Sequence, residues 1–130
     1  MNKIVEKFLR YVAVETTSNP DGDSQPSSEK ELVLSKMLVD ELKSMGIADA
    51  ELDKDCYVMA TIPSNTDKDV PVIGFIAHVD TAPDAPGADI KPQFVENYDG
   101  GDICINKEKN MYLRVSEFPE MAQYKGDTII

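Results

Sequence analysis

The segment from Val70 to Asp84 decides more about the fold of this chain than any other. It reads VPVIGFIAHVDTAPD, and residues 72–77 within it form an almost unbroken apolar run between two prolines. A short run of β-branched and aromatic residues with such borders is typical of a strand buried on both faces of a sheet. We therefore expect Val72–Ala77 to form the central strand of the fold.

The expected strand leads into His78, which is the only histidine of the chain, and then into Asp80. Successive side chains in a strand alternate between the two faces, so His78 and Asp80 leave the same face. In open α/β sheets, ligands bind beyond the carboxyl ends of the strands. This pair is therefore the first candidate for chemistry.

Two interpretations of the pair stay open on these residues alone. In the first, His78 is a metal ligand, and the Asp80 carboxylate holds the other ring nitrogen and fixes the tautomer of the imidazole. In the second, His78 is a structural histidine bonded to a nearby carboxylate, and Asp80 caps the following loop through its backbone. A histidine and an aspartate two residues apart are too common a pattern to decide between them.

Two helices precede this strand. Apolar residues recur at steps of three and four between Asn2 and Glu15, which predicts an amphipathic helix. A second helix is predicted from the capping box of Ser28 and Glu31 to the stop signal at Gly46. Both helices are expected to pack their apolar stripes on the sheet.

The remaining strands are short, and they complete an α/β fold in which helices flank a mixed β-sheet. The turn-rich segment Pro63–Asp69 is short enough to join the preceding strand to the central strand as an antiparallel hairpin. The other predicted elements are the strands Ala50–Asp53, Tyr57–Ile62, Ile103–Ile105 and Met111–Leu113, a helical turn within Phe118–Tyr124, and the start of a strand at Gly126–Ile130.

Composition disfavours several classes of function. The 130 residues are 42% apolar, which suits a folded domain, and no apolar stretch reaches the length of about twenty residues that a membrane span needs. The net charge of −11 disfavours binding to nucleic acid or to anionic membranes, because both require basic surfaces. Residues 1–15 lack the apolar core of a signal peptide, and Cys56 and Cys104 have neither metal-site nor disulfide spacing, so we expect a cytoplasmic protein.

Three segments of the chain carry a resemblance to a known family. They are KFLRYVAVETTS at residues 7–18, IGFIAHVDTAPD at residues 73–84 and ENYDGGDI at residues 96–103. Together they resemble the co-catalytic zinc exopeptidase and aminoacylase family, and within it the tripeptide aminopeptidases. The likeness extends along essentially the whole chain.

The resemblance implies a function and a division of roles. It makes residues 1–130 the N-terminal portion of a zinc-exopeptidase catalytic domain, with His78 as a zinc ligand and Asp80 in the catalytic site beside it. The complete enzyme would bind two zinc ions and release the N-terminal residue from tripeptides. Its bridging aspartate, general-base glutamate, remaining ligands and lid domain would follow Ile130. One imidazole does not close a zinc site, so this chain alone is expected to be inactive and to bind zinc at most weakly.

Two alternatives to this function are kept. The first is another dizinc exopeptidase, or a deacylase of N-acyl amino acids, from the same family. The second is a non-catalytic acidic binding domain with the same fold. The sequence does not give the side-chain preference for a peptide substrate, and for the full-length enzyme it leaves a homodimer open.

Overall fold

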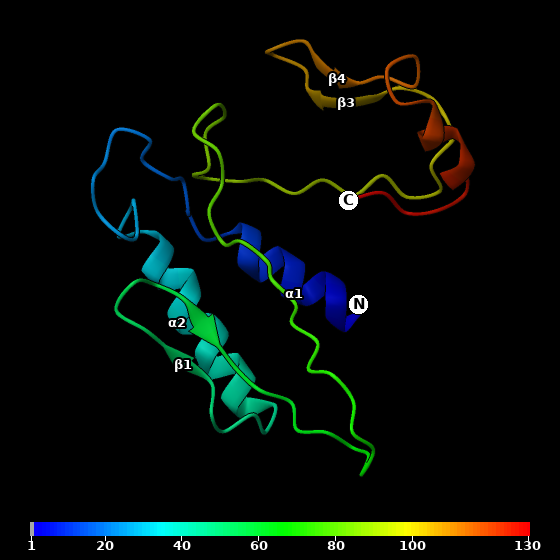
Figure 1. Cartoon of the computed structure of the whole chain (residues 1–130). Helices are drawn as coiled ribbons and strands as arrows, with labels where there is room; N and C mark the ends of the chain where they lie inside the picture. The colour runs from blue at the N-terminus through cyan, green and yellow to red at the C-terminus, as the bar shows by residue number, and fades with distance from the viewer. Residues whose placement is uncertain (1) are drawn as a thin grey trace. The chain divides into compact units, whose positions relative to one another are not determined.

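The longest element in the computed structural model, which describes residues 2–130, is the helix α2 (Glu31–Ser44) (Figure 1). Half of the capping box predicted at its start is confirmed: the Glu31 carboxylate accepts a hydrogen bond from the backbone N–H of Ser28 at 3.1 Å, whereas the Ser28 hydroxyl accepts from the N–H of Lys30 at 3.4 Å and not from that of Glu31. Its end is confirmed as well. Gly46 adopts a φ of 92°, and the N–H of Ile47 bonds back to the carbonyl of Leu42 at 3.1 Å, which is the Schellman pattern.

A small antiparallel hairpin packs against α2 in the same part of the chain (Figure 1). Its strands are β1 (Glu51–Leu52) and β2 (Val58–Met59), and both lie within the predicted strands. The core between helix and hairpin is small. Its buried side chains include Leu34, Ser35, Val39, Ala50 and Cys56.

The first helix, α1 (Lys3–Val12), begins where the sequence predicts, with the side chain of Asn2 accepting a hydrogen bond from the N–H of Ile4 at 2.9 Å. The expectation that its apolar stripe packs on a sheet is wrong. Ile4 is 74% exposed and Phe8 is 48% exposed, and none of the helix's residues is buried. The helix instead contacts α2 through its charged side, as described below.

The predicted central strand at Val72–Ala77 is also wrong for the described chain. Residues 60–80 contain neither helix nor strand, and Val72 and Ile76 are 98% and 100% exposed. A strand is stabilised by ladder hydrogen bonds from neighbouring strands. No described segment supplies them here, so the apolar run stays extended without a partner. Because no strand forms at Val72–Ala77, the expected antiparallel hairpin through Pro63–Asp69 does not form either.

The chain divides into two compact units at Ile90, and the second unit is Lys91–Ile130. It contains an antiparallel hairpin of β3 (Ile103–Asn106) and β4 (Met111–Leu113), followed by the 3-10 helix η1 (Pro119–Tyr124). These elements confirm the strands and the helical turn predicted there. The expected strand near the end is reduced to a single bridge between Val95 and Ile129.

Helices and small antiparallel sheets thus occur together, and the predicted α/β class is confirmed. What differs from the expectation is the size of the sheets, each of which has two strands. No helix in the described part of the chain has both the length and the apolar character required to cross a membrane.

Candidate functional site

His78 and Asp80 lie in contact, as the sequence predicts. The Nδ1 atom of His78 is 3.0 Å from Oδ1 of Asp80, and the two side chains are 82% and 41% exposed. A carboxylate can only accept in such a bond, so Nδ1 is the protonated nitrogen and a neutral ring keeps its lone pair on Nε2. The arrangement presents a bare imidazole nitrogen to solvent, which is the form in which histidine binds a metal.

The structure also bears on the second interpretation of Asp80. Among residues 2–130, no backbone N–H donates a hydrogen bond to the Asp80 carboxylate, and its one side-chain hydrogen bond is to the His78 ring. The bond to the ring is therefore the contact that the structure supports. The roles of the two residues, ligand and supporting carboxylate, stay predictions.

A metal ion needs more donors than this pair. Catalytic zinc sites take about three protein ligands and leave a position for water. Among the described residues, no three His, Cys, Asp or Glu side chains come together in a way that could hold a metal. The imidazole of His78 fits the role of one zinc ligand, and the described residues do not complete a site around it.

The residue after Asp80 is held by a segment that sequence reasoning did not connect with it. Thr81 forms a parallel bridge with Thr17, although the bridge joins parts of the chain about sixty residues apart. The N–H of Thr81 donates to the carbonyl of Thr16 at 3.0 Å, and the carbonyl of Thr81 accepts from the N–H of Ser18 at 3.0 Å. Two isolated threonines in turn-rich segments carry no pattern that would have revealed this pairing.

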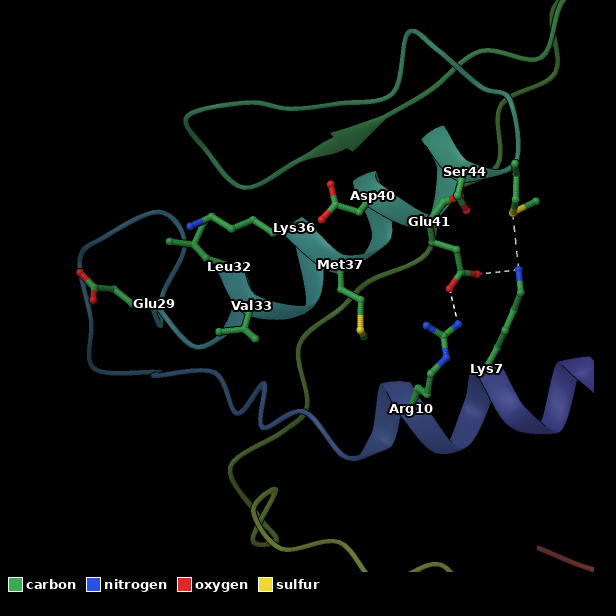
Figure 2. Close-up of a pocket in the computed structure, with 11 residues that line it drawn as sticks. Lys7, Arg10, Glu29, Leu32, Val33, Lys36, Met37, Asp40, Glu41 and Ser44 are labelled. Carbon is green, nitrogen blue, oxygen red and sulfur yellow. Dashed lines mark hydrogen bonds and ion pairs between the residues drawn. The ribbon is translucent and has the colours of Figure 1, made fainter.

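A second candidate is an open groove of about 910 Å³ between α1 and α2 (Figure 2). Figure 2 shows Lys7 and Arg10 of α1 directed at Glu41 of α2. The distance from Lys7 Nζ to Glu41 Oε1 is 2.6 Å, Arg10 pairs with the other carboxylate oxygen, and the hydroxyl of Tyr11 donates to Oε1 at 2.8 Å.

These contacts determine the protonation of the cluster. Hydrogen bonds from Lys7, then from Tyr11 and Arg10, lower the pKa of Glu41 to about 2. Burial, together with the Glu41 carboxylate, raises the pKa of Tyr11. Glu41 therefore stays ionised and is already the partner of both cations that α1 directs into the groove. The groove contains no nucleophile paired with a base, and we assign the cluster to the attachment of α1 to α2.

The acidic turn of the second unit, residues 97–102, has a structural role. Tyr98 is 2% exposed, and its hydroxyl donates to the carbonyl of Gly101 at 2.5 Å. Burial, reinforced by the carboxylates of Asp99 and Asp102, raises the pKa of Tyr98. The backbone of Tyr98 bonds to Asp127 and Gly126 on the neighbouring segment. The turn thus holds residues 126–127 in place through hydrogen bonds. Its side chains do not form a metal-binding group among the described residues.

Comparison with known proteins identifies similar sequences that cover the whole chain. No family model matches it. Proteins named peptidase T match it along its whole length: that of Clostridium novyi (strain NT) is 56% identical over 130 residues, and that of Geobacillus sp. (strain WCH70) is 53% identical over 129 residues. The protein of that name from Alkaliphilus oremlandii (strain OhILAs) is 52% identical over 132 residues. These matches cover 99–100% of this chain, and the chain spans 32% of the length of each of these curated relatives.

Proposed function

We propose, on the premise that this chain belongs to the peptidase T family, that it forms part of a metal-dependent aminopeptidase that releases the N-terminal residue from tripeptides. The observation that supports a site at this position is the bond between His78 and Asp80, which leaves Nε2 of the ring available. Zinc is one of the metals that bind such a nitrogen together with carboxylates, and it is the metal that the family resemblance implies.

The roles follow from the chemistry of the two side chains. His78 would hold the metal through Nε2. Asp80 would keep the ring in the tautomer and orientation that binding requires, and its negative charge would make the imidazole a better donor. Bound zinc lowers the pKa of a coordinated water to about 7, which supplies hydroxide for peptide hydrolysis. The complete enzyme would hold two such ions.

This chain provides only one imidazole toward that site. We therefore expect the 130-residue chain by itself neither to retain equimolar zinc through dialysis nor to hydrolyse tripeptides. Retention of zinc, or zinc-dependent turnover by the chain alone, would contradict this expectation.

The proposal is tested on the full-length protein. Wild type, His78→Ala and the control Asp84→Asn are compared for zinc content and for hydrolysis of tripeptides, dipeptides and N-acyl amino acids. Asp84 lies in the same segment and makes no side-chain hydrogen bond or ion pair among the described residues, so its variant controls for a substitution in this segment that leaves His78 and Asp80 in place. Zinc loss and loss of tripeptide turnover in His78→Ala alone would support the proposal.

The same assays separate the alternatives. Faster turnover of dipeptides or N-acyl amino acids would indicate another exopeptidase or a deacylase of the family. Zinc-free protein without hydrolysis of any of the three substrates would favour an acidic binding domain.

We also propose a cytoplasmic location and a small peptide as the partner. Cys56 and Cys104 are both free thiols, which suits a reducing compartment. The net charge of −11 disfavours nucleic acid as a partner. A homodimer of the full-length protein stays a prediction.

A further inference from the structure

Five residues form what we call the Thr81 clamp: Thr16, Thr17, Ser18, Thr81 and Gly87. Both backbone groups of Thr81 are bonded within it, to the carbonyl of Thr16 and to the N–H of Ser18, each at 3.0 Å. The hydroxyl of Ser18 adds a third bond to the Thr81 carbonyl at 3.1 Å. Thr16, on the segment that follows α1, is 3% exposed, so this side of the clamp is buried.

The clamp is the backbone attachment of a long part of the chain. Within the described residues, Thr81 makes the only backbone–backbone hydrogen bonds that join residues 62–94 to another segment. The segment before it is exposed and carries no ladder. The position of Asp80, one residue before Thr81, is therefore set by the clamp more than by anything that precedes it.

Gly87 closes the clamp from the other side. A Cβ atom added at Gly87 would clash with the hydroxyl oxygen of Thr17 and would lie 3.1 Å from that of Thr81. The Thr17 hydroxyl is buried and has no hydrogen-bond partner among the described residues. The missing side chain at Gly87 therefore permits the loop after Asp80 to lie close against Thr17, an approach that any larger residue would block.

We infer that the Thr81 clamp positions Asp80 so that its carboxylate stays on Nδ1 of His78. The inference rests on the proposed function. The hydrogen bond from Nδ1 of His78 to Asp80 would be important for metal binding, because it leaves Nε2 free to bind the metal. Ser18 and Gly87 are positioning residues in this account. They touch neither ring nor carboxylate, and they act by fixing the backbone from which Asp80 projects.

The tautomer of His78 provides a direct test, because the chain has no other histidine. At about pH 9, where an ordinary imidazole is neutral, the ¹⁵N shifts of the ring distinguish a proton on Nδ1 from one on Nε2. The 130-residue chain is measured without metal. Wild type is expected to show mainly the Nδ1–H form, and Asp80→Ala provides the reference for a ring without its carboxylate.

Gly87→Ala is expected to move the ring shifts at least halfway from wild type to the Asp80→Ala reference. Gly74→Ala is the matched control: Gly74 lies in the same segment, and an added Cβ there would meet nothing within 4 Å. This control is expected to keep wild-type shifts. Wild-type shifts in Gly87→Ala would overturn the inference, as would an equal change in both glycine variants.

A second variant keeps the test decisive if Gly87→Ala loses its helical circular dichroism. Ser18→Ala removes only the side-chain bond to Thr81 and leaves both backbone bonds possible. A smaller shift in the same direction would support the clamp, and unchanged shifts would overturn it. Because no metal is present, this result does not depend on whether His78→Ala loses zinc in the full-length protein, which tests the proposed function separately.

Discussion

Asp80 contacts the ring of His78 through Nδ1, at 3.0 Å, so that Nε2 is the nitrogen left for another partner. A carboxylate that supports a metal-bound histidine typically contributes 10–100-fold to metal affinity or activity. This relationship can be tested by substitution, because in this chain the His78 side chain is 82% exposed and that of Asp80 is 41% exposed.

Asp80→Asn in the full-length protein is expected to weaken zinc affinity about 10–100-fold. The neutral amide forms a weaker hydrogen bond to the ring and no longer raises the basicity of the imidazole nitrogen that binds the metal. His78→Ala should have a larger effect, since it removes a ligand. Zinc affinity is measured by competition with a chelator. If Asp80→Asn shows wild-type affinity and turnover, Asp80 has only a local structural role.

The ion cluster on Glu41 predicts a dependence of stability on pH. The pKa of Glu41 is lowered to about 2 in the folded chain, whereas that of an unfolded glutamate is about 4.3. The folded state therefore gains stability above the unfolded pKa and loses it as the pH falls toward the folded value. We expect the free energy of unfolding to decrease between about pH 4.5 and pH 2, as measured by denaturant titration.

Glu41→Gln should make that decrease shallower and lower the stability near pH 7, because Lys7 and Arg10 lose their shared partner. Asp40→Asn is the matched control. Asp40 lies in the same groove, next to Glu41, and makes no ion pair among residues 2–130. Identical pH profiles for Glu41→Gln and wild type would refute the assignment of this dependence to the cluster.

The end of α2 gives a stability prediction that does not involve the site. Gly46 has a φ of 92°, a conformation that costs an L-residue roughly 1–2 kcal/mol, so Gly46→Ala should lower the free energy of unfolding by about that amount. An added Cβ would meet nothing within 4 Å, so the effect reports backbone strain and not a clash. Gly74→Ala, which has equally open surroundings, should change the stability little.

Backbone amide exchange tests the absence of the central strand. The amides of residues 72–77 have no backbone acceptor in the described chain and should exchange at nearly unprotected rates, whereas those in the middle of α2 should be slow. Mass spectrometry of the exchanging chain resolves the two segments. Protection of residues 72–77 as strong as that of α2 would mean that this segment has a partner after all.

The features that could be predicted from the sequence depend on residues that are close together in the chain. The start and end of α2 were predictable, because the bond from the Ser28 N–H to the Glu31 carboxylate and the left-handed Gly46 depend on residues a few positions apart. The contact of His78 with Asp80 was predictable for the same reason, since two residues separated by one can reach each other in any extended backbone.

What the sequence did not give depends on distant partners. The apolar character of Val72–Ala77 predicts a strand, but a ladder needs a second segment, and nothing within one segment identifies it. The stripe of α1 likewise predicts a buried face without saying what covers it. Thr17 and Thr81 meet through backbone groups that every residue possesses, so no residue type marks the bridge.

The exposed run of Val72, Ile73, Phe75 and Ile76 has a consequence for the chain in concentrated solution. An unpaired, uncharged segment of high β-propensity is a template on which a second copy can add a strand, and repeated addition leads to aggregates. The net charge of −11 opposes this by keeping the molecules apart. Salt shortens the range of that repulsion to about 10 Å at 0.1 M, so the colloidal stability of the chain should decline with ionic strength while each molecule keeps its fold.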